Sequence, residues 1–215
     1  MEINSVGNSI YFRGGLKKNL RQGERALCEF KEEFPYVKSS TYWHKRLNNI
    51  NRKRRVEHYT GCDFIIMGYD DKIEELRSTL NSMRLMGQDC LENLRRIMRE
   101  EKFGNCEEAA DIISANLNRA GIEHKKMRLD IQRRAGWGND DHAFIVIGMD
   151  KKAIPSQPST WGNKAVIIDG WMNFVLSAKD GLSEYERFFD AKYIDPRKDT
   201  TKGLTPRFYF SEIGQ

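Results

Sequence analysis

Residues 126–132, Lys-Met-Arg-Leu-Asp-Ile-Gln, alternate strictly between polar and apolar side chains. This period of two is typical of a β-strand that has one face on a core. Two further stretches, His142-Ala-Phe-Ile-Val-Ile-Gly148 and Ala165-Val-Ile-Ile-Asp169, are rich in β-branched residues and predict two more strands, which a loop over 151–164 joins. The segment 207–211, Arg-Phe-Tyr-Phe-Ser, resembles a final strand. We therefore expect an antiparallel sheet in the C-terminal half of the chain.

Upstream of these strands the apolar residues recur at three- and four-residue spacing, which is typical of amphipathic helices. The expected helices span residues 14–34, about 41–56, a long stretch from Asp70 that Gly87 divides, 105–121 and, after the strands, 183–189. Pro35 ends the first helix, because proline cannot continue one. Helices come first and one helix then packs on the sheet, so the sequence predicts an α+β fold. We divide the chain into a helical, basic N-terminal region, residues 1–100, and a core, residues 101–215, within one integrated domain.

The chain has 215 residues, of which 39% are hydrophobic and 31% charged, which suits one domain with a real core. It contains no apolar run near the roughly 18 residues of a membrane-spanning helix. The N-terminus lacks the basic and apolar segments of a conventional secretion signal. Four isolated cysteines without a CxxC pair suit a reducing compartment better than a disulfide framework. We therefore expect a soluble protein that needs no metal and no cofactor.

The formal net charge of +5 lies wholly in the N-terminal half of the chain. Much of it falls within residues 44–57, where basic side chains are crowded. Such a run can bind an acidic protein surface, anionic lipid or nucleic acid, although a solvated helix face is the simpler interpretation. For a binding role we expect an acidic protein partner rather than nucleic acid, contacted by Lys45, Arg46, Arg52, Lys53, Arg54 and Arg55.

Cys106 follows a Gly-Asn turn and lies in the first turn of the helix expected over 105–121. Unpaired N–H groups and the positive dipole end of a helix N-terminus stabilise a thiolate, the nucleophilic form of cysteine. Glu107 and Glu108 oppose this effect by charge repulsion, although they point elsewhere on the helix surface. Because a single cysteine is more often a buried structural residue, Cys106 alone does not define a site.

His142 begins one expected strand, and Asp169 ends the next. If these strands pair antiparallel, the start of the first lies beside the end of the second. With residue 142 opposite residue 169, both side chains project from one face as direct neighbours. Asp169 can then bind one imidazole nitrogen and leave the other for a thiol. Together with Cys106, these residues form the nucleophile, base and orienting acid of a thiol enzyme.

Three blocks resemble the transglutaminase-like branch of the papain-like thiol enzymes: Gly104-Asn-Cys-Glu-Glu-Ala-Ala110, Asp141-His-Ala-Phe-Ile-Val-Ile-Gly148 and Trp161-Gly-Asn-Lys-Ala-Val-Ile-Ile-Asp-Gly-Trp171. They are similar in particular to segments of bacterial effectors and toxins that read GNCxxxA, HAFVVIG and WG…VVDPW. The resemblance covers about residues 100–175, and the blocks follow the family order. It aligns Cys106 with the nucleophile, His142 with the base and Asp169 with the orienting acid. Gly170 stands where many members have proline.

The resemblance implies a papain-like or transglutaminase-like fold that forms an acyl-enzyme with protein amide bonds. The reaction is then that of a cysteine protease, a glutamine deamidase or a transglutaminase, and we favour the first two. The resemblance also implies a bacterial effector that modifies a host protein, made in the bacterial cytoplasm and secreted without a cleaved signal into the host cell cytosol.

For the oxyanion we expect the Cys106 backbone N–H as the first donor and Asn105, Trp137 or Trp161 as the second. The competing hypothesis is a non-enzymatic binding module. In that case the basic N-terminal region docks a protein or nucleic acid partner, and the triad-like residues are coincidental.

Overall fold

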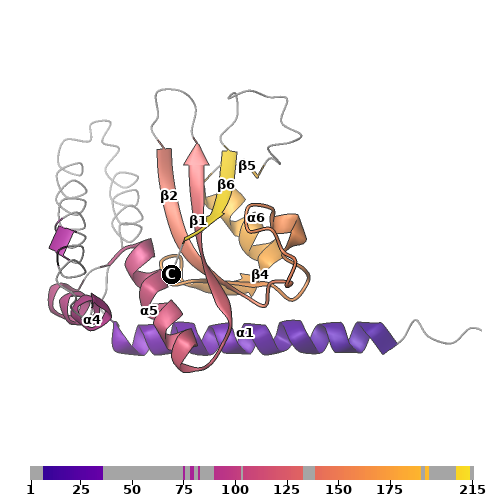
Figure 1. Cartoon of the computed structure of the whole chain (residues 1–215), viewed down its shortest axis with the longest axis horizontal. Coiled ribbons are helices and arrows are strands. Elements are labelled where there is room, and N and C mark those ends of the chain that lie inside the picture. The colour runs from indigo at the N-terminus through magenta and orange to yellow at the C-terminus, as the bar shows by residue number, and fades with distance from the viewer. Residues whose placement is uncertain are drawn as a thin grey trace, which may run out of the picture.

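The computed structural model describes residues 7–35, 90–102, 104–132, 139–189, 192–193 and 207–213, together with 75, 78–79 and 82. The helix expected near 41–56 and the start of the long stretch from Asp70 lie outside these described residues. In the described part, helices cover both faces of one β-sheet (Figure 1).

The described helices are α1 (Gly7–Glu33), α4 (Cys90–Glu101), α5 (Cys106–Arg119) and α6 (Ala178–Phe189). α1 begins earlier than expected and ends two residues before Pro35, at the predicted stop. Gly23 is a weak helix former near its centre, but a Cβ there would lie 2.8 Å from Val175 Cγ1 and 3.0 Å from Ile168 Cγ1. This glycine therefore lets α1 lie directly on the strands that carry the two residues.

Six strands form one sheet in the order β4-β3-β2-β1-β6-β5. Their bounds are β1 (His124–Gln132), β2 (Asn139–Ile147), β3 (Val166–Asp169), β4 (Phe174–Ser177), β5 (Lys192–Tyr193) and β6 (Arg207–Glu212). Neighbouring strands are antiparallel except β5 and β6, which are parallel. The α+β class and the antiparallel pairing of β2 with β3 are thereby confirmed. The sequence analysis does not predict β4 and β5: β5 has only two residues, and the four residues of β4 include one β-branched side chain, whereas the four of β3 include three.

Each face of the sheet has its own hydrophobic core. Ala143, Ile145 and Ile147 of β2 pack with residues of α1, α4 and α5, whereas Phe144 and Val146 pack on the opposite face, which α6 covers. In Figure 1, α1 runs along one side of the sheet and α6 lies against another part of it. A strand that is buried on both faces needs apolar side chains at successive positions, which explains the continuous apolar run in β2.

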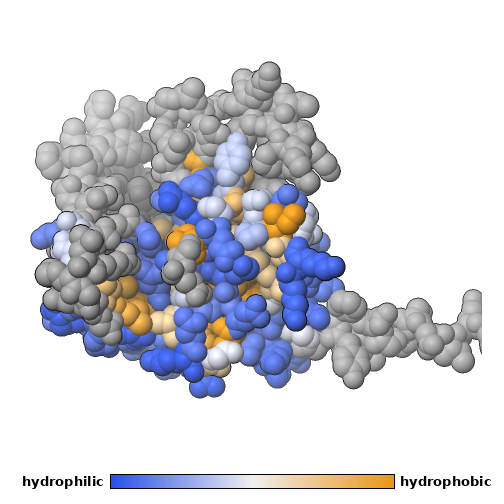
Figure 2. All heavy atoms as spheres, viewed as in Figure 1, coloured by the Kyte–Doolittle hydropathy of each residue, from blue (hydrophilic) through white to orange (hydrophobic). Residues whose placement is uncertain are grey.

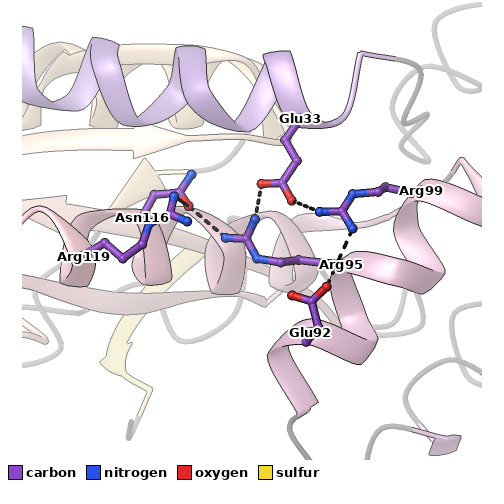
Figure 3. Close-up of polar contacts among 6 residues, drawn as sticks. All are labelled: Glu33, Glu92, Arg95, Arg99, Asn116 and Arg119. Carbon is purple, nitrogen blue, oxygen red and sulfur yellow. Dashed lines mark hydrogen bonds and ion pairs between the residues drawn. The ribbon is translucent and has the colours of Figure 1, made fainter.

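An ionic network joins α1, α4 and α5 (Figure 3). Glu33, at the end of α1, accepts hydrogen bonds from Arg95 and, at 2.6 Å, from Arg99. Arg95 is only 7% exposed and also donates to Asn116 Oδ1 of α5 at 2.9 Å, an oxygen that Arg119 reaches at 2.9 Å. Because a buried guanidinium requires charged or polar partners, these contacts fix the three helices relative to one another.

The described part of the surface in Figure 2 is mainly hydrophilic, with separate apolar patches. One patch lies where the C-terminal end of α1 meets α4. Among the described helices, none combines the length and the apolar character needed to cross a membrane.

Candidate active site

The candidate site lies where β3 separates from β2. Pairing between these strands covers Ile145–Ile147 and Val166–Ile168, with Ile145 opposite Ile168. Continued by one residue, this register puts Phe144 opposite Asp169, so the predicted pairing of residue 142 with residue 169 is wrong by two residues. A shift of two residues preserves the face of a strand, and His142 becomes a diagonal neighbour of Asp169.

Asp169 and His142 form a direct hydrogen bond on the α6 face of the sheet. His142 Nε2–H donates to Asp169 Oδ2 at 2.6 Å, and both side chains are buried. The Tyr185 hydroxyl of α6 donates to the same oxygen at 2.8 Å, and the backbone N–H of Met172 donates to Oδ1 at 2.8 Å. Burial and the charge of Asp169 raise the pKa of Tyr185 well above 10, so this hydroxyl keeps its proton. The carboxylate thus accepts three hydrogen bonds, which fix its orientation and that of the imidazole.

His142 is surrounded by aromatic rings and carries a strongly perturbed pKa. Burial alone would lower this pKa, because a charge is poorly solvated inside a protein. The charge and hydrogen bond of Asp169, together with the hydrogen bond and charge of Cys106, outweigh burial and raise the pKa from 6.5 to about 10. The ring centroid lies 4.9 Å from that of Trp171 and 5.4 Å from that of Tyr185. At neutral pH the structure therefore holds His142 as an imidazolium.

Cys106 is the first residue of α5, and its thiol lies close enough to His142 to raise the pKa of the imidazole. Because His142 Nε2 is bonded to Asp169, Nδ1 is the nitrogen left for the sulfur. The sequence analysis expects Glu108 to point elsewhere on the helix surface, and this expectation is wrong. The Glu108 carboxylate turns back to the helix start and accepts the Asn105 backbone N–H at 3.0 Å. The Cys106 N–H belongs to the first turn, where backbone donors have no partner inside the helix.

Cys106 comes from the α5 face of the sheet and His142 from the α6 face. They come together where the pairing of β2 with β3 ends, because the last pair is Ile145 with Ile168 and residues 142–144 of β2 have no partner in β3. Gly170 follows β3 at this point, and a Cβ there would lie 2.8 Å from Ile113 Cδ1 and 3.0 Å from Ala109 Cβ. The glycine therefore lets the turn after β3 pack directly against α5, close to the sulfur.

The remaining candidates are the residues expected to donate to the oxyanion and the basic residues expected to bind a partner. Asn105 lines a cavity beside the site, but its backbone N–H is occupied by Glu108. Trp161 is fully buried, and its indole N–H donates to the carbonyl of Pro155 at 3.1 Å, so we do not retain it as an oxyanion donor. Outside the described residues lie Trp137 and the basic residues Lys45, Arg46, Arg52, Lys53, Arg54 and Arg55.

The local sequence pattern assigns no role in the site to Tyr185 or Trp171. Tyr185 reaches Asp169 only because α6 folds back over β3, a tertiary contact that periodicity does not encode. Trp171 packs against His142 from the turn after β3, with the two rings tilted by 48°. Its position two residues after Asp169, in the third block of the resemblance, is the one available signal for a place in the site.

The arrangement can supply a thiol nucleophile, an oriented imidazole and a helix-start N–H. Across the described ranges, no group of three His, Cys, Asp or Glu side chains is placed to hold a metal ion. Comparison of the chain with protein-family models, curated proteins and solved structures finds no match.

Proposed function

We propose that the protein is a thiol enzyme that acts on protein amide bonds through Cys106, His142 and Asp169. The observation that carries this proposal is the buried imidazole of His142, which is hydrogen-bonded to Asp169 through Nε2 and lies close enough to Cys106 for the thiol to raise its pKa. A nucleophile, a base and a group that orients the base are the set required for covalent catalysis by a thiol. The resemblance over about residues 100–175 independently supports the same three roles, and it extends the proposal to a bacterial effector that modifies a host protein.

The first half of the reaction forms an acyl-enzyme. The Cys106 sulfur, as thiolate, attacks the carbonyl carbon of the amide, and the Cys106 backbone N–H donates to the developing oxyanion. His142, as imidazolium, gives its Nδ1 proton to the departing nitrogen while the carbon–nitrogen bond breaks. The products of this half are a thioester on Cys106, a neutral His142 and a free amine or ammonia.

The second half releases the acyl group. His142 Nδ1 now accepts a proton from the attacking water, and the hydroxyl oxygen bonds to the thioester carbon. Collapse of the tetrahedral intermediate breaks the carbon–sulfur bond and restores the thiolate beside the imidazolium. Asp169 holds Nε2–H throughout, so Nδ1 remains the nitrogen that exchanges protons with the reacting groups.

The decisive experiment compares the alkylation of the cysteines by iodoacetamide at pH 6, read by mass spectrometry of tryptic peptides. Cys28 is exposed, but its hydrogen bond to Glu32, the charge of that carboxylate and minor desolvation raise its pKa. An ordinary thiol is roughly 0.3% thiolate at pH 6, so exposure alone gives slow labelling. We expect the buried Cys106 to react at least about tenfold faster than the exposed Cys28, because it is paired with an imidazolium.

Two histidine variants provide the matched controls. His142→Gln should slow the labelling of Cys106 to the rate of an ordinary buried thiol. His124 is a second buried histidine, bonded to Ser114 Oγ at 2.6 Å and to the Ile122 carbonyl at 2.9 Å, so His124→Gln should leave that rate unchanged. Faster labelling of Cys28 than of Cys106, or no effect of His142→Gln, would overturn the proposal.

The same thiol can serve three reactions, which differ in the group that leaves and the group that attacks the thioester. New protein N-termini indicate a protease, and glutamate in place of glutamine indicates a deamidase. Incorporation of a labelled primary amine indicates a transglutaminase. Incubating the wild type and Cys106→Ala in parallel with a host-cell protein extract, with and without such an amine, distinguishes these outcomes, and we expect hydrolysis or deamidation.

A further inference from the structure

A cavity of about 560 Å³ opens between the C-terminal end of α1, the end of α4 and the turn after β3. This volume is within the range of roughly 300–1,000 Å³ that is usual for ligand sites. Its apolar lining among the described residues consists of Phe30, Phe34, Pro35, Met98, Ala109 and Trp171. Lys31, Gly104, Asn105, Gly170 and Asn173 also line the cavity, so the part of its wall formed by the apolar side chains is the part that suits an apolar group.

The cavity adjoins the candidate active site through two of its lining residues. Asn105 lines it and directly precedes Cys106, while Ala109 lies one turn further along the same helix. Trp171 also lines it, and its ring packs against that of His142 with the centroids 4.9 Å apart. A group held in the cavity is thus close to both the nucleophile and the base.

Most of the apolar walls come from outside the region that resembles the thiol enzymes. Phe30 and Phe34 belong to α1 and the residue that follows it, and Met98 belongs to α4. Phe30 and Phe34 pack together with ring centroids 5.5 Å apart, and Arg99 lies over Phe34 at 5.9 Å. The ionic network of Figure 3 holds these two helices in place, so the walls are preformed rather than assembled by the ligand.

We propose that this cavity is the specificity pocket of the site and binds an aromatic or large aliphatic side chain of the polypeptide substrate, next to the amide that Cys106 attacks. The inference rests on the proposed function, since it assumes that Cys106 is acylated by a polypeptide. Lys31, which is exposed on α1, is the one charged residue of the described lining. Buried apolar walls at Phe30, Phe34 and Met98, with the one charge on an exposed residue, favour an apolar side chain that enters from a solvated peptide.

The test uses two alkylating probes of equal chemistry and needs no knowledge of the natural substrate. N-benzyl iodoacetamide carries a phenyl ring that three chain atoms separate from the reacting carbon, and iodoacetamide has no such ring. The measured quantity is the ratio of their alkylation rates at Cys106, divided by the same ratio for free cysteine. Burial of even part of a phenyl ring should raise this normalised ratio to about ten.

Phe34→Leu removes one aromatic wall of the cavity and should lower the normalised ratio about threefold. Phe210→Leu is the matched control, because Phe210 is similarly buried, at 4% exposure against 5% for Phe34, but belongs to the core on the other face of the sheet. Its ratio should equal that of the wild type. Division by the iodoacetamide rate removes any general loss of Cys106 reactivity in either variant.

The outcomes separate the two proposals. A Cys106 that labels no faster than Cys28 counts against the thiol enzyme and the pocket together. A rapidly labelled Cys106 whose normalised ratio is near one in the wild type refutes the pocket alone. An equal fall in Phe34→Leu and Phe210→Leu also refutes it, because the preference would then reflect general softening of the fold.

Discussion

Replacing Asp169 with asparagine should lower the pKa of His142 and change which imidazole nitrogen carries the proton of the neutral ring. Asparagine has nearly the same shape and can still accept the Met172 N–H, so the turn after β3 has a replacement partner. The side chain loses its negative charge, and its amide nitrogen is a donor rather than an acceptor. With that nitrogen facing Nε2, the neutral imidazole carries its proton on Nδ1, which is the wrong tautomer for taking a proton from the thiol.

The magnitude follows from the pKa of His142. The difference between about 10 and the ordinary value of 6.5 corresponds to roughly 5 kcal/mol in favour of the imidazolium. Asp169 is the largest of the influences that raise the pKa, whereas burial acts in the opposite direction and remains in the variant. We therefore expect the pKa of His142 in Asp169→Asn at or below 6.5. At pH 8 the imidazolium fraction then falls from about 99% to about 3% or less.

The assay is an NMR titration of protein labelled with ¹³C at histidine Cε1. The resonance of His142 is assigned by its loss in His142→Gln. In the wild type it should titrate near 10, and in Asp169→Asn at or below 6.5. Asp141→Asn is the control, because Asp141 is exposed and paired with Arg128 at 2.9 Å, and it should leave the titration unchanged.

The same shift has a consequence for stability. The pKa of His142 is higher in the folded than in the unfolded chain, so its contribution is complete below about pH 6.5 and is lost as the pH rises through about 10. Urea unfolding should therefore show the wild type losing more stability than Asp169→Asn between pH 6.5 and 10. A wild-type His142 that titrates near 6.5, or equal pH slopes for the two proteins, would refute the reasoning.

Three further changes test the scaffold of the site. Tyr185→Phe removes one donor to the carboxylate and should cost about 1.5–3 kcal/mol in urea unfolding, with Cys106 still the fastest-labelled thiol. Gly170→Ala forces a methyl group against α5 and should cost about 1–3 kcal/mol while slowing iodoacetamide labelling, so a fully active variant would contradict the described packing. Glu33→Gln leaves the buried Arg95 without its carboxylate and should cost about 3 kcal/mol, whereas the exposed pair broken by Glu29→Gln should cost less than about 1 kcal/mol.

Sequence pattern predicts the elements of this fold better than their contacts. β1 alternates strictly between polar and apolar residues, and β2 contains a run of β-branched residues. Both patterns follow from which faces of the strand are buried, because buried positions require apolar residue types, so both strands can be predicted from the sequence. The start of α5 at Cys106 follows from the Gly-Asn turn that precedes it. The α+β class and the pairing of β2 with β3 follow from the order and the loop between them.

Of the features that the sequence pattern missed, the strand register and the Tyr185 bond depend on tertiary contacts, whereas the start of α6 has a local signal. The register of β2 against β3 differs by two residues from the expected one, because a two-residue shift leaves every side chain on its predicted face and the sequence cannot distinguish the two registers. α6 begins at Ala178, five residues before the expected start, where Ser177 Oγ accepts the Asp180 N–H at 3.2 Å. That cap is a local signal, and Ser177 could have been read as an N-cap residue. The bond from Tyr185 to Asp169 has no local signal at all.

The donors around Asp169 also determine the direction in which protons can move. Three groups, His142 Nε2–H, the Tyr185 hydroxyl and the Met172 N–H, all donate to its two oxygens. An ionised carboxylate can accept all three, whereas a protonated one would have to place its own hydrogen against a donor. Asp169 therefore has no proton to give, and Nε2–H is held in place. Proton exchange is left to Nδ1, the nitrogen available to Cys106, and the proposed chemistry is confined to the side of the imidazole that faces the nucleophile helix.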